Sequence, residues 1–222
     1  MDVNNDFADH YIRVVNSSGI INTFAGNGLI GYLSLDENQP ATSVALPRPQ
    51  AVTEDTEGNI CIADTYNKRI RLVTTSGIIA TIAGNRLVAF ADNVAATSSG
   101  LYFPTSMQVM PNRDFFIAVR SNNRICKVSH GIITTVVGGG GSFADNVFAN
   151  LNNPTGVWIS SVDSSIYIAD TSNYRIRAVD GVTKIITTIA GNGTQGNGSD
   201  NIAATSSMLS FTCNIKSTII YC

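Results

Sequence analysis

The stretch from Ile62 to Asn85 reads I-A-D-T-Y-N-K-R-I-R-L-V-T-T-S-G-I-I-A-T-I-A-G-N. It returns from Ile168 to Asn192 as I-A-D-T-S-N-Y-R-I-R-A-V-D-G-V-T-K-I-I-T-T-I-A-G-N. Two matching ends around a variable middle indicate an internal duplication. Each copy predicts two strands joined by a polar turn, followed by a third strand that ends at a glycine.

Two weaker copies complete the series, one from Val3 to Asn27 and one from Ile117 to Gly139. A glycine closes each of the four copies, and these glycines are 58, 54 and 53 residues apart: Gly26, Gly84, Gly138 and Gly191. A steady period of this size is typical of a propeller or solenoid array.

The second copy shows the repeating unit most clearly, with four short strand patterns separated by turn signals at residues 49–53, 60–63, 69–73 and 78–83. The pattern at 60–63 is almost entirely apolar, which predicts a strand buried on both faces. A repeat of paired helices is excluded because β-branched residues crowd the apolar runs and glycine recurs every few residues. Four antiparallel strands per period indicate a propeller blade.

We therefore predict an all-β fold, a β-propeller of four-stranded antiparallel blades in a single domain over residues 1–222. The expected units are a partial blade 1 (3–27), blade 2 (46–85), blade 3 (101–139), blade 4 (151–192) and a partial C-terminal blade (207–222). Three full blades and two partial ones predict an open arc whose bare edges invite self-association. A small ring closed by the two partial blades is the alternative.

Composition limits the classes of function. The 222 residues are 44% apolar and 14% charged, with a net charge of −2, so nucleic acid or an anionic membrane is not expected as the main partner. No signal peptide is visible, and no apolar run reaches the roughly 18 residues of a membrane span. The compartment stays unknown. Cys61 and Cys126 fall in apolar strand patterns and are expected to be buried.

The polar turn after the second strand has its own pattern. Asp64 ends one strand and Arg69 opens the next, so the two are expected to face each other as a partly exposed pair worth about 0.2–1 kcal/mol. Asp170 and Arg175 repeat this arrangement. Because Asp and Asn side chains bond to nearby backbone N–H groups, we interpret the motif as a structural staple of the turn.

The linkers between blades also repeat. Each begins with an acidic residue: Asp36, Asp92, Asp145 and Asp200. In three of them an Ala-Thr-Ser sequence follows, and a leucine comes next in all four: Leu46, Leu101, Leu151 and Leu209. We expect the Ala-Thr-Ser turn to close the blade end and the leucine to anchor it. A binding surface or cation sites remain the alternative, although one carboxylate per loop is too few for calcium.

Four stretches carry a family resemblance: A-G-N-G at 25–28, P-A-T-S at 40–43, P-T-G-V at 154–157 and Y-I-A-D-T-S-N-Y-R-I-R at 167–177. With these motifs the chain resembles the NHL-repeat family of β-propellers, whose members commonly have six blades. The resemblance implies a role in binding proteins, RNA or extracellular ligands, or an amidating lyase activity. It specifies the fold and leaves the function open.

A lyase of that type needs a cluster of metal-binding histidines, and this chain has only His10 and His130, both expected at the surface. We therefore expect no catalytic, cofactor-binding or metal-binding residues, and a non-catalytic interaction scaffold as the function. The alternatives are a propeller enzyme of the lyase or lactonase type, an RNA-binding NHL module, and a structural fragment of a larger protein.

The partner, another protein or a small ligand, is expected on the propeller face that carries the turns between second and third strands and the inter-blade loops. In a four-stranded meander these two connections emerge at the same edge. The candidate binding residues are Thr65, Tyr66, Asn67, Arg69, Asn122, Arg124, Thr171, Ser172, Asn173 and Arg175.

Overall fold

The computed structural model describes residues 10–31, 36–139, 150–210, 214–216 and 219–221. Within these ranges every regular element is a β-strand or a three-residue 3-10 helix. The predicted all-β class is confirmed. No helix of the described residues is long and apolar enough to cross a membrane.

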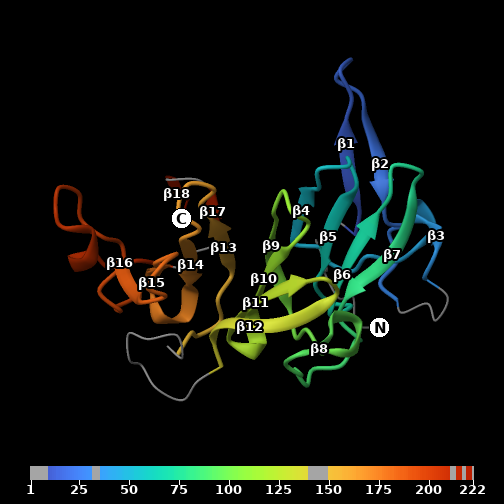
Figure 1. Cartoon of the computed structure of the whole chain (residues 1–222). Helices are drawn as coiled ribbons and strands as arrows, with labels where there is room; N and C mark the ends of the chain where they lie inside the picture. Colours follow the sequence, from blue (N-terminus) through green and yellow to red (C-terminus); the bar gives the residue numbers. More distant parts are fainter. Residues whose placement is uncertain (1–9, 32–35, 140–149, 211–213, 217–218, 222) are drawn as a thin grey trace, which may run out of the picture.

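Three antiparallel meanders of four strands form the body of the molecule (Figure 1). Blade 2 consists of β4 (Ala51–Glu54), β5 (Ile60–Asp64), β6 (Arg69–Val73) and β7 (Ile78–Ala83). Blade 3 consists of β9 (Pro104–Val109), β10 (Phe115–Val119), β11 (Arg124–Ser129) and β12 (Ile132–Gly138). Blade 4 consists of β13 (Gly156–Ile159), β14 (Ile166–Asp170), β15 (Arg175–Val179) and β16 (Ile186–Ala190).

Strand bounds follow the expected pattern closely in blade 2, except at the first strand. It was expected at 49–53 and is found at Ala51–Glu54. Pro49 has no N–H for the ladder, and Arg48 before it has a left-handed backbone (φ +48°). In blades 3 and 4 the turn between second and third strands is a 3-10 helix, η3 (Arg120–Asn122) and η4 (Thr171–Asn173).

The linkers extend two of the blades by a short fifth strand. β3 (Gln39–Pro40) pairs with β7, and β8 (Val94–Ala95) pairs with β12. The Ala-Thr-Ser sequences then form the 3-10 helices η1 (Ala41–Ser43), η2 (Ala96–Ser98) and η5 (Ala204–Ser206). Their alanine carbonyls accept the N–H groups of the closing glycines, as in Gly84 N to Ala96 O at 2.9 Å. The linker therefore closes the blade end as predicted.

The closing glycines are required by space as well as by conformation. Gly84 and Gly191 have φ values of +91° and +89°. A Cβ at either position would collide with the backbone carbonyl oxygen of the residue just before the neighbouring strand, Lys68 or Tyr174. Glycine alone meets both demands, which explains why a glycine recurs at the end of each repeat.

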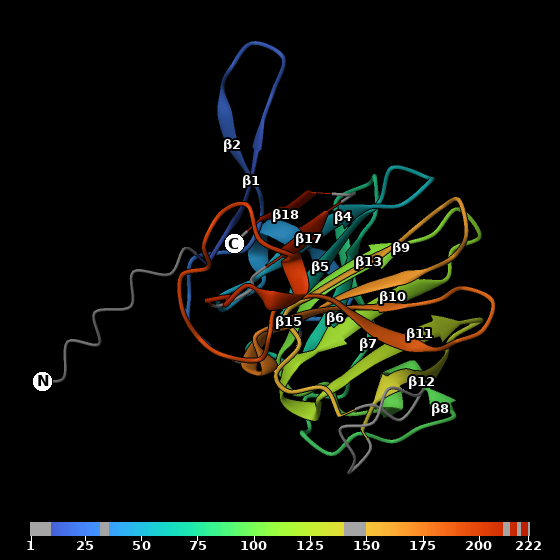
Figure 2. The same ribbon diagram turned by 90° about the vertical axis from the view of Figure 1, so that its left-hand side faces the viewer.

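Two-stranded sheets stand at both ends of the array, β1 (Ile12–Val15) with β2 (Ile21–Ala25), and β17 (Asn214–Lys216) with β18 (Ile219–Tyr221). The strand expected before β1 falls in residues that lie outside the described ranges. In Figures 1 and 2 the β1–β2 hairpin projects from the rest of the fold.

The innermost strands of successive blades lie side by side around a central cavity of about 460 Å³. β4, β9 and β13 line it, together with Ile215 of β17. The side chain of Gln108 on β9 joins blades 3 and 4 by bonding both the N–H and the carbonyl of Ile159, at 2.6 and 3.1 Å. β17 packs against blade 4 because Ile215 belongs to the same apolar cluster as Ala169 and Ile176.

The sheets pack on apolar residues contributed mainly by the second strands. Ile62, Ile117 and Ile168 are fully buried, one in each blade. The linker leucines Leu46, Leu101 and Leu151 are buried between blades as expected, whereas Leu209 is only partly buried. Cys61 and Cys126 are buried free thiols, as predicted, and burial raises the pKa of Cys61 to about 12.

Candidate functional site

We call one edge of the blades the turn face. The turns between second and third strands and the inter-blade linkers emerge at the same edge of each blade. In blade 2 the pair Asp64–Arg69 lies at this edge, and Lys68 contacts Gly84 across it. The asparagines that follow three of the closing glycines, Asn27, Asn85 and Asn192, bond across the linker, as in Asn85 Nδ2 to Ser98 O at 2.7 Å.

Four of the ten candidate residues are not available to a partner. Thr65, Asn67, Arg69 and Thr171 are buried. The other six are partly exposed: Tyr66, Asn122, Arg124, Ser172, Asn173 and Arg175. The prediction that all ten form a binding surface is therefore wrong for the buried four, because their polar groups are used inside the fold.

The buried residues of the turn hold blades together. Asn67 donates from Nδ2 to Asp64 Oδ2 at 2.8 Å and to Ala45 O at 3.2 Å. Thr65 Oγ1 donates to Pro104 O at 2.7 Å, which joins blade 2 to blade 3. Asn173 repeats the first pair of bonds in blade 4, to Asp170 Oδ2 and to Asn150 O. The interpretation of this motif as a staple fits these contacts.

The Asp64–Arg69 pair was expected to be partly exposed, and this is wrong. Both residues are buried, with Arg69 Nη2 3.7 Å from Asp64 Oδ2. The turn is covered by the preceding linker, whose acidic residues reach the third strand. Asp36 bonds to Arg69 and Arg71, and Arg86 lies 2.8 Å from it. Glu37 bonds to Arg69 at 2.9 Å.

This charge cluster of blade 2 shifts the pKa values of its members. Burial works to raise the pKa of Asp36, but the hydrogen bond from Arg69 and the surrounding guanidinium charges outweigh it and lower that pKa to about 2. For Asp64 burial prevails over the bond from Asn67 and the arginine charges, and the pKa rises to about 6. Burial lowers the pKa of Arg71.

The sequence analysis aligned Asp36 with Asp92 as the first acidic residue of each linker, but the two do not occupy equivalent positions in the structure. Glu37 accepts the N–H of Thr81 at 2.7 Å, and Asp92 accepts the N–H of Thr135 at 2.8 Å. Glu37 and Asp92 thus hold the same position against the fourth strand. Asp36 is an additional acid, and it is the one that enters the charge cluster.

The turn face also exposes apolar side chains in two of its linkers, which the sequence analysis missed. The Oδ1 atoms of Asn27 and Asn85 accept the backbone N–H two residues later, from Leu29 and Leu87 respectively. This fold of the loop presents two apolar pairs, Leu29–Ile30 and Leu87–Val88, which are 49% to 65% exposed. The recurrence of a leucine followed by a β-branched residue after Asn27 and after Asn85 was the available signal.

An aromatic cluster lies on the same face. The rings of Tyr66 and Phe103 meet edge to face with centroids 5.1 Å apart, and Tyr102 packs beside Phe103. Arg48 donates to the Tyr66 hydroxyl at 3.0 Å and lies over its ring. All four side chains are partly exposed.

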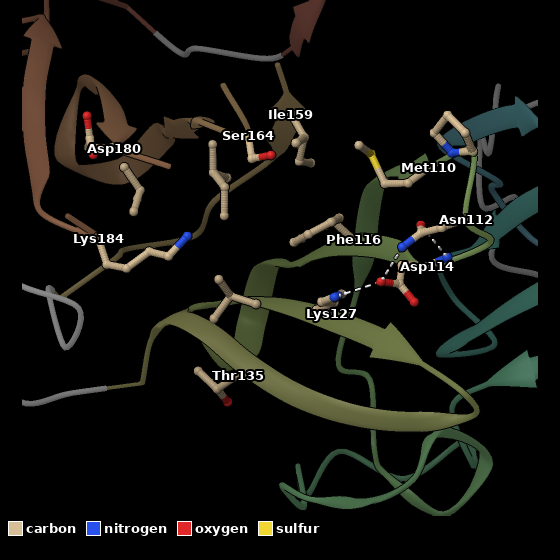
Figure 3. Close-up of a pocket in the computed structure, with 14 residues that line it drawn as sticks. Met110, Asn112, Asp114, Phe116, Lys127, Thr135, Ile159, Ser164, Asp180 and Lys184 are labelled. Atoms are coloured by element: carbon tan, nitrogen blue, oxygen red, sulfur yellow. Dashed lines mark hydrogen bonds and ion pairs between the residues drawn. The ribbon is translucent and has the colours of Figure 1, made fainter. Parts of the chain in front are cut away.

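A pocket of about 640 Å³ opens at the opposite edge, between blades 3 and 4 (Figure 3). Its walls are apolar, with Met110 and Phe116 from blade 3 and Ile159 and Ile166 from blade 4. Lys127 and Lys184 line it as well. No residue of this pocket was among the candidates predicted from the sequence.

The two histidines differ in position. His10 was expected at the surface, and this is wrong, because it is buried and its Nδ1 accepts the backbone N–H of Arg48 at 3.2 Å. His130 is exposed, as predicted. Among the described residues, no group of three or more His, Cys, Asp or Glu is arranged to hold a metal ion.

Comparison with known proteins bears on the fold. No protein-family model matches the chain. Over 56 residues it is 41% identical to the Protein SUPPRESSOR OF QUENCHING 1, chloroplastic, of Arabidopsis thaliana, a match that covers 25% of this chain and 5% of that protein.

Two solved structures extend the comparison. A Bacteroides thetaiotaomicron protein of unknown function has a TM-score of 0.60 and 14% identity, over 93% of this chain and 48% of that one. An auxiliary nutrient binding protein from Bacteroides ovatus has a TM-score of 0.51 and 19% identity, over 62% and 36%. This chain therefore spans about half, or less, of the length of the solved proteins it matches.

The structural neighbours are β-propellers. This chain has a β-propeller fold. In propeller terms, the central cavity lined by β4, β9 and β13 is the channel, and each meander is a blade whose first strand faces that channel. None of the sheets formed by the described residues closes on itself.

Proposed function

We propose that the chain is a non-catalytic interaction scaffold of the NHL-repeat propeller type that binds another protein on its turn face. The observation that carries this proposal is that two exposed apolar pairs, Leu29–Ile30 and Leu87–Val88, lie in equivalent linkers at the same edge. Exposed apolar side chains that recur on one face are typical of interaction sites rather than of an inert surface.

The neighbouring aromatic cluster fits the same role. Tyrosine and arginine are enriched among the residues that dominate the energy of protein interfaces. Tyr66 and Arg48 are partly exposed and hold each other in place, so they present a contact surface that loses little side-chain freedom on binding. The NHL-type motif at 167–177 and the propeller fold support the assignment to this type of scaffold.

Selection from a random peptide library tests the proposal without a known partner. Peptides enriched on the wild-type protein are measured against the double variant Leu87→Ser with Val88→Ser. We expect at least a tenfold loss of affinity, because a buried apolar side chain contributes about 1.5–3 kcal/mol.

The matched control replaces two exposed valines at the opposite edge, Val162→Ser with Val182→Ser, whose side chains are 95% and 85% exposed. This variant should bind the same peptides as the wild type does. Failure to enrich any peptide, or an equal loss in the control, would reject the turn face as the binding surface.

The enzyme alternative makes a different prediction. A propeller lyase of the family's type would hold a metal ion, so elemental analysis of the purified protein separates the two functions. We expect less than a tenth of an equivalent of any transition metal per chain, and one equivalent of zinc would favour the enzyme. RNA binding and a purely structural role stay alternatives that the peptide selection addresses.

A further inference from the structure

The pocket between blades 3 and 4 has an apolar floor taken from the inter-blade core. Ile159, Ile166 and Val179 are buried members of that core, and Met110, Phe116 and Val136 pack against them while remaining partly exposed. Its volume of about 640 Å³ lies within the roughly 300–1,000 Å³ of ligand pockets. At the same edge, the cavity between blades 2 and 3 measures only about 220 Å³.

Two ammonium groups reach this pocket from opposite blades (Figure 3). Lys127 comes from β11 and lies 5.9 Å from the centre of the Phe116 ring. Lys184 comes from the turn between β15 and β16, and its Nζ donates to the carbonyl of Gly181. The aromatic ring of Phe116 lies between the two lysines in the view.

The carboxylates of the pocket already accept several hydrogen bonds. Asp114 Oδ2 accepts from Lys127 Nζ at 2.6 Å and from Asn112 Nδ2 at 2.9 Å. Asp180 Oδ1 accepts from the N–H groups of Val182 and Thr183 and from the Thr183 hydroxyl. Because an ammonium has three donors, the two lysines keep donor capacity after these bonds.

The two lysines and two aspartates of the lining balance in formal charge, but the carboxylates are occupied by hydrogen bonds while the ammonium groups keep donors. A cavity with apolar walls and such donors at its mouth complements an amphipathic anion. We propose that the pocket between blades 3 and 4 binds a small carboxylic acid with an apolar body, whose carboxylate accepts from Lys184 and Lys127 and whose body packs on Phe116, Met110 and Ile159. This site lies at the opposite edge from the turn face, so it is independent of the proposed protein binding.

Calorimetric titration with three isosteric probes tests this: 4-phenylbutyrate, 4-phenylbutan-1-ol and 4-phenylbutylamine. We expect the carboxylate to bind most tightly and the amine most weakly. Loss of a charge-assisted hydrogen bond in the variant Lys184→Gln should weaken phenylbutyrate binding about tenfold, and should leave the affinity for the alcohol unchanged.

Two further variants serve as a control for the lysine and as a test of the apolar floor. Lys68→Gln removes a lysine at the turn face and should leave the affinity for phenylbutyrate unchanged. Met110→Trp fills the apolar floor and should weaken binding of both the acid and the alcohol, with its folded state verified by circular dichroism. No binding of phenylbutyrate at millimolar concentration, binding of the amine as tight as that of the acid, or an equal loss in Lys68→Gln would overturn the proposal.

Discussion

Blade 2 and blade 4 carry the same Asp-Thr-x-Asn-x-Arg-Ile-Arg motif, yet their buried aspartates have different surroundings. Asp170 Oδ2 accepts from Asn173, and its Oδ1 accepts the backbone N–H of Asn152 at 2.8 Å. Asp64 Oδ2 accepts from Asn67 in the same way. Asp64 Oδ1, however, is buried and receives no hydrogen bond from the described residues.

The missing donor is explained by one residue of the preceding linker. Asn67 bonds to Ala45 O where Asn173 bonds to Asn150 O, so position 47 corresponds to position 152. The residues that follow, Arg48 and Asn153, share a left-handed backbone at φ +48° and +49°. Position 47 is proline, which has no N–H, and Asp64 therefore lacks the bond that Asp170 has.

The arginines of the two blades differ as well. In blade 2 the linker acids Asp36 and Glu37 surround Arg69 and Arg71. The linker that precedes blade 4 carries Asp145, which lies outside the described residues, whereas Asp200 belongs to the linker after that blade and is exposed. The charges that balance the arginines of blade 2 thus come from outside the shared motif, from the linker that precedes the blade. Four predictions test this difference, from the largest expected effect to the smallest.

Replacement of Asp36 by alanine should lower the free energy of unfolding by about 3–5 kcal/mol, because it leaves the buried guanidinium groups of Arg69 and Arg71 without their main counter-charge. Urea denaturation measures the change. The control substitution Asp200→Ala, at an exposed acid in the linker after blade 4, should change stability by no more than about 0.5 kcal/mol. Equal effects at the two sites would show that the charge cluster of blade 2 is not special.

Ile62→Ala and Ile168→Ala should each cost about 2–5 kcal/mol, because both side chains are fully buried in the second strand of their blade. The two costs should be similar, since the apolar cores of the blades are alike even though their charges differ. Ile132→Ala, at a 43% exposed position, is the control and should cost much less. A loss below about 1 kcal/mol at Ile62 alone would mean that the charge cluster has loosened the core of blade 2.

The raised pKa of Asp64 should make blade 2 sensitive to pH. The folded-state pKa of about 6 lies above the ordinary 3.8, so this group stabilises the fold fully below about pH 4, and that contribution is lost as the pH rises through 6. The loss is at most about 3 kcal/mol. In Asp64→Asn the slope of stability between pH 4 and 7 should become flatter than in the wild type.

Asp170→Asn is the companion measurement for that pH dependence. Burial raises the pKa of Asp170 too, but the backbone bond from Asn152 acts against it. The change of slope should therefore have the same sign as in Asp64→Asn and a smaller size. A larger change in blade 4 than in blade 2 would contradict the comparison.

Pro47→Ala should restore the missing donor and stabilise the protein by about 1 kcal/mol. The new bond to a charged acceptor should raise the free energy of unfolding by about 1.5–3 kcal/mol. Loss of the proline, which restrains the unfolded chain, should lower it by about 0.4–1 kcal/mol. The pKa of Asp64 should fall, which carbonyl chemical shifts in a pH titration would report. The reciprocal variant Asn152→Pro should raise the pKa of Asp170, and an unchanged Asp170 titration would refute the role given to the proline.

Much of the fold was predictable because its signals are local. The strands Arg69–Val73 and Ile78–Ala83 were placed correctly from alternation and glycine alone. The register that sets Asp64 against Arg69 followed from the length of the turn between them. The closing glycines and the Ala-Thr-Ser helices recur in every period whose linker is described. They bond to each other, so the contact involves only one blade and the linker that follows it. Internal repetition made each of these signals visible several times.

What only the tertiary structure decided are the contacts between segments far apart in the chain. Asp36 meets Arg69 across 33 residues, and this contact turned an expected surface pair into a buried cluster. The exposure of Leu87 and Val88 and the pocket around Phe116 depend on how neighbouring blades pack against each other. The sequence by itself determined the repeat, the strands and the turns, because these rest on the conformational preferences of neighbouring residues. Burial, charge balance and open space are properties of the packed array, and no single repeat contains them.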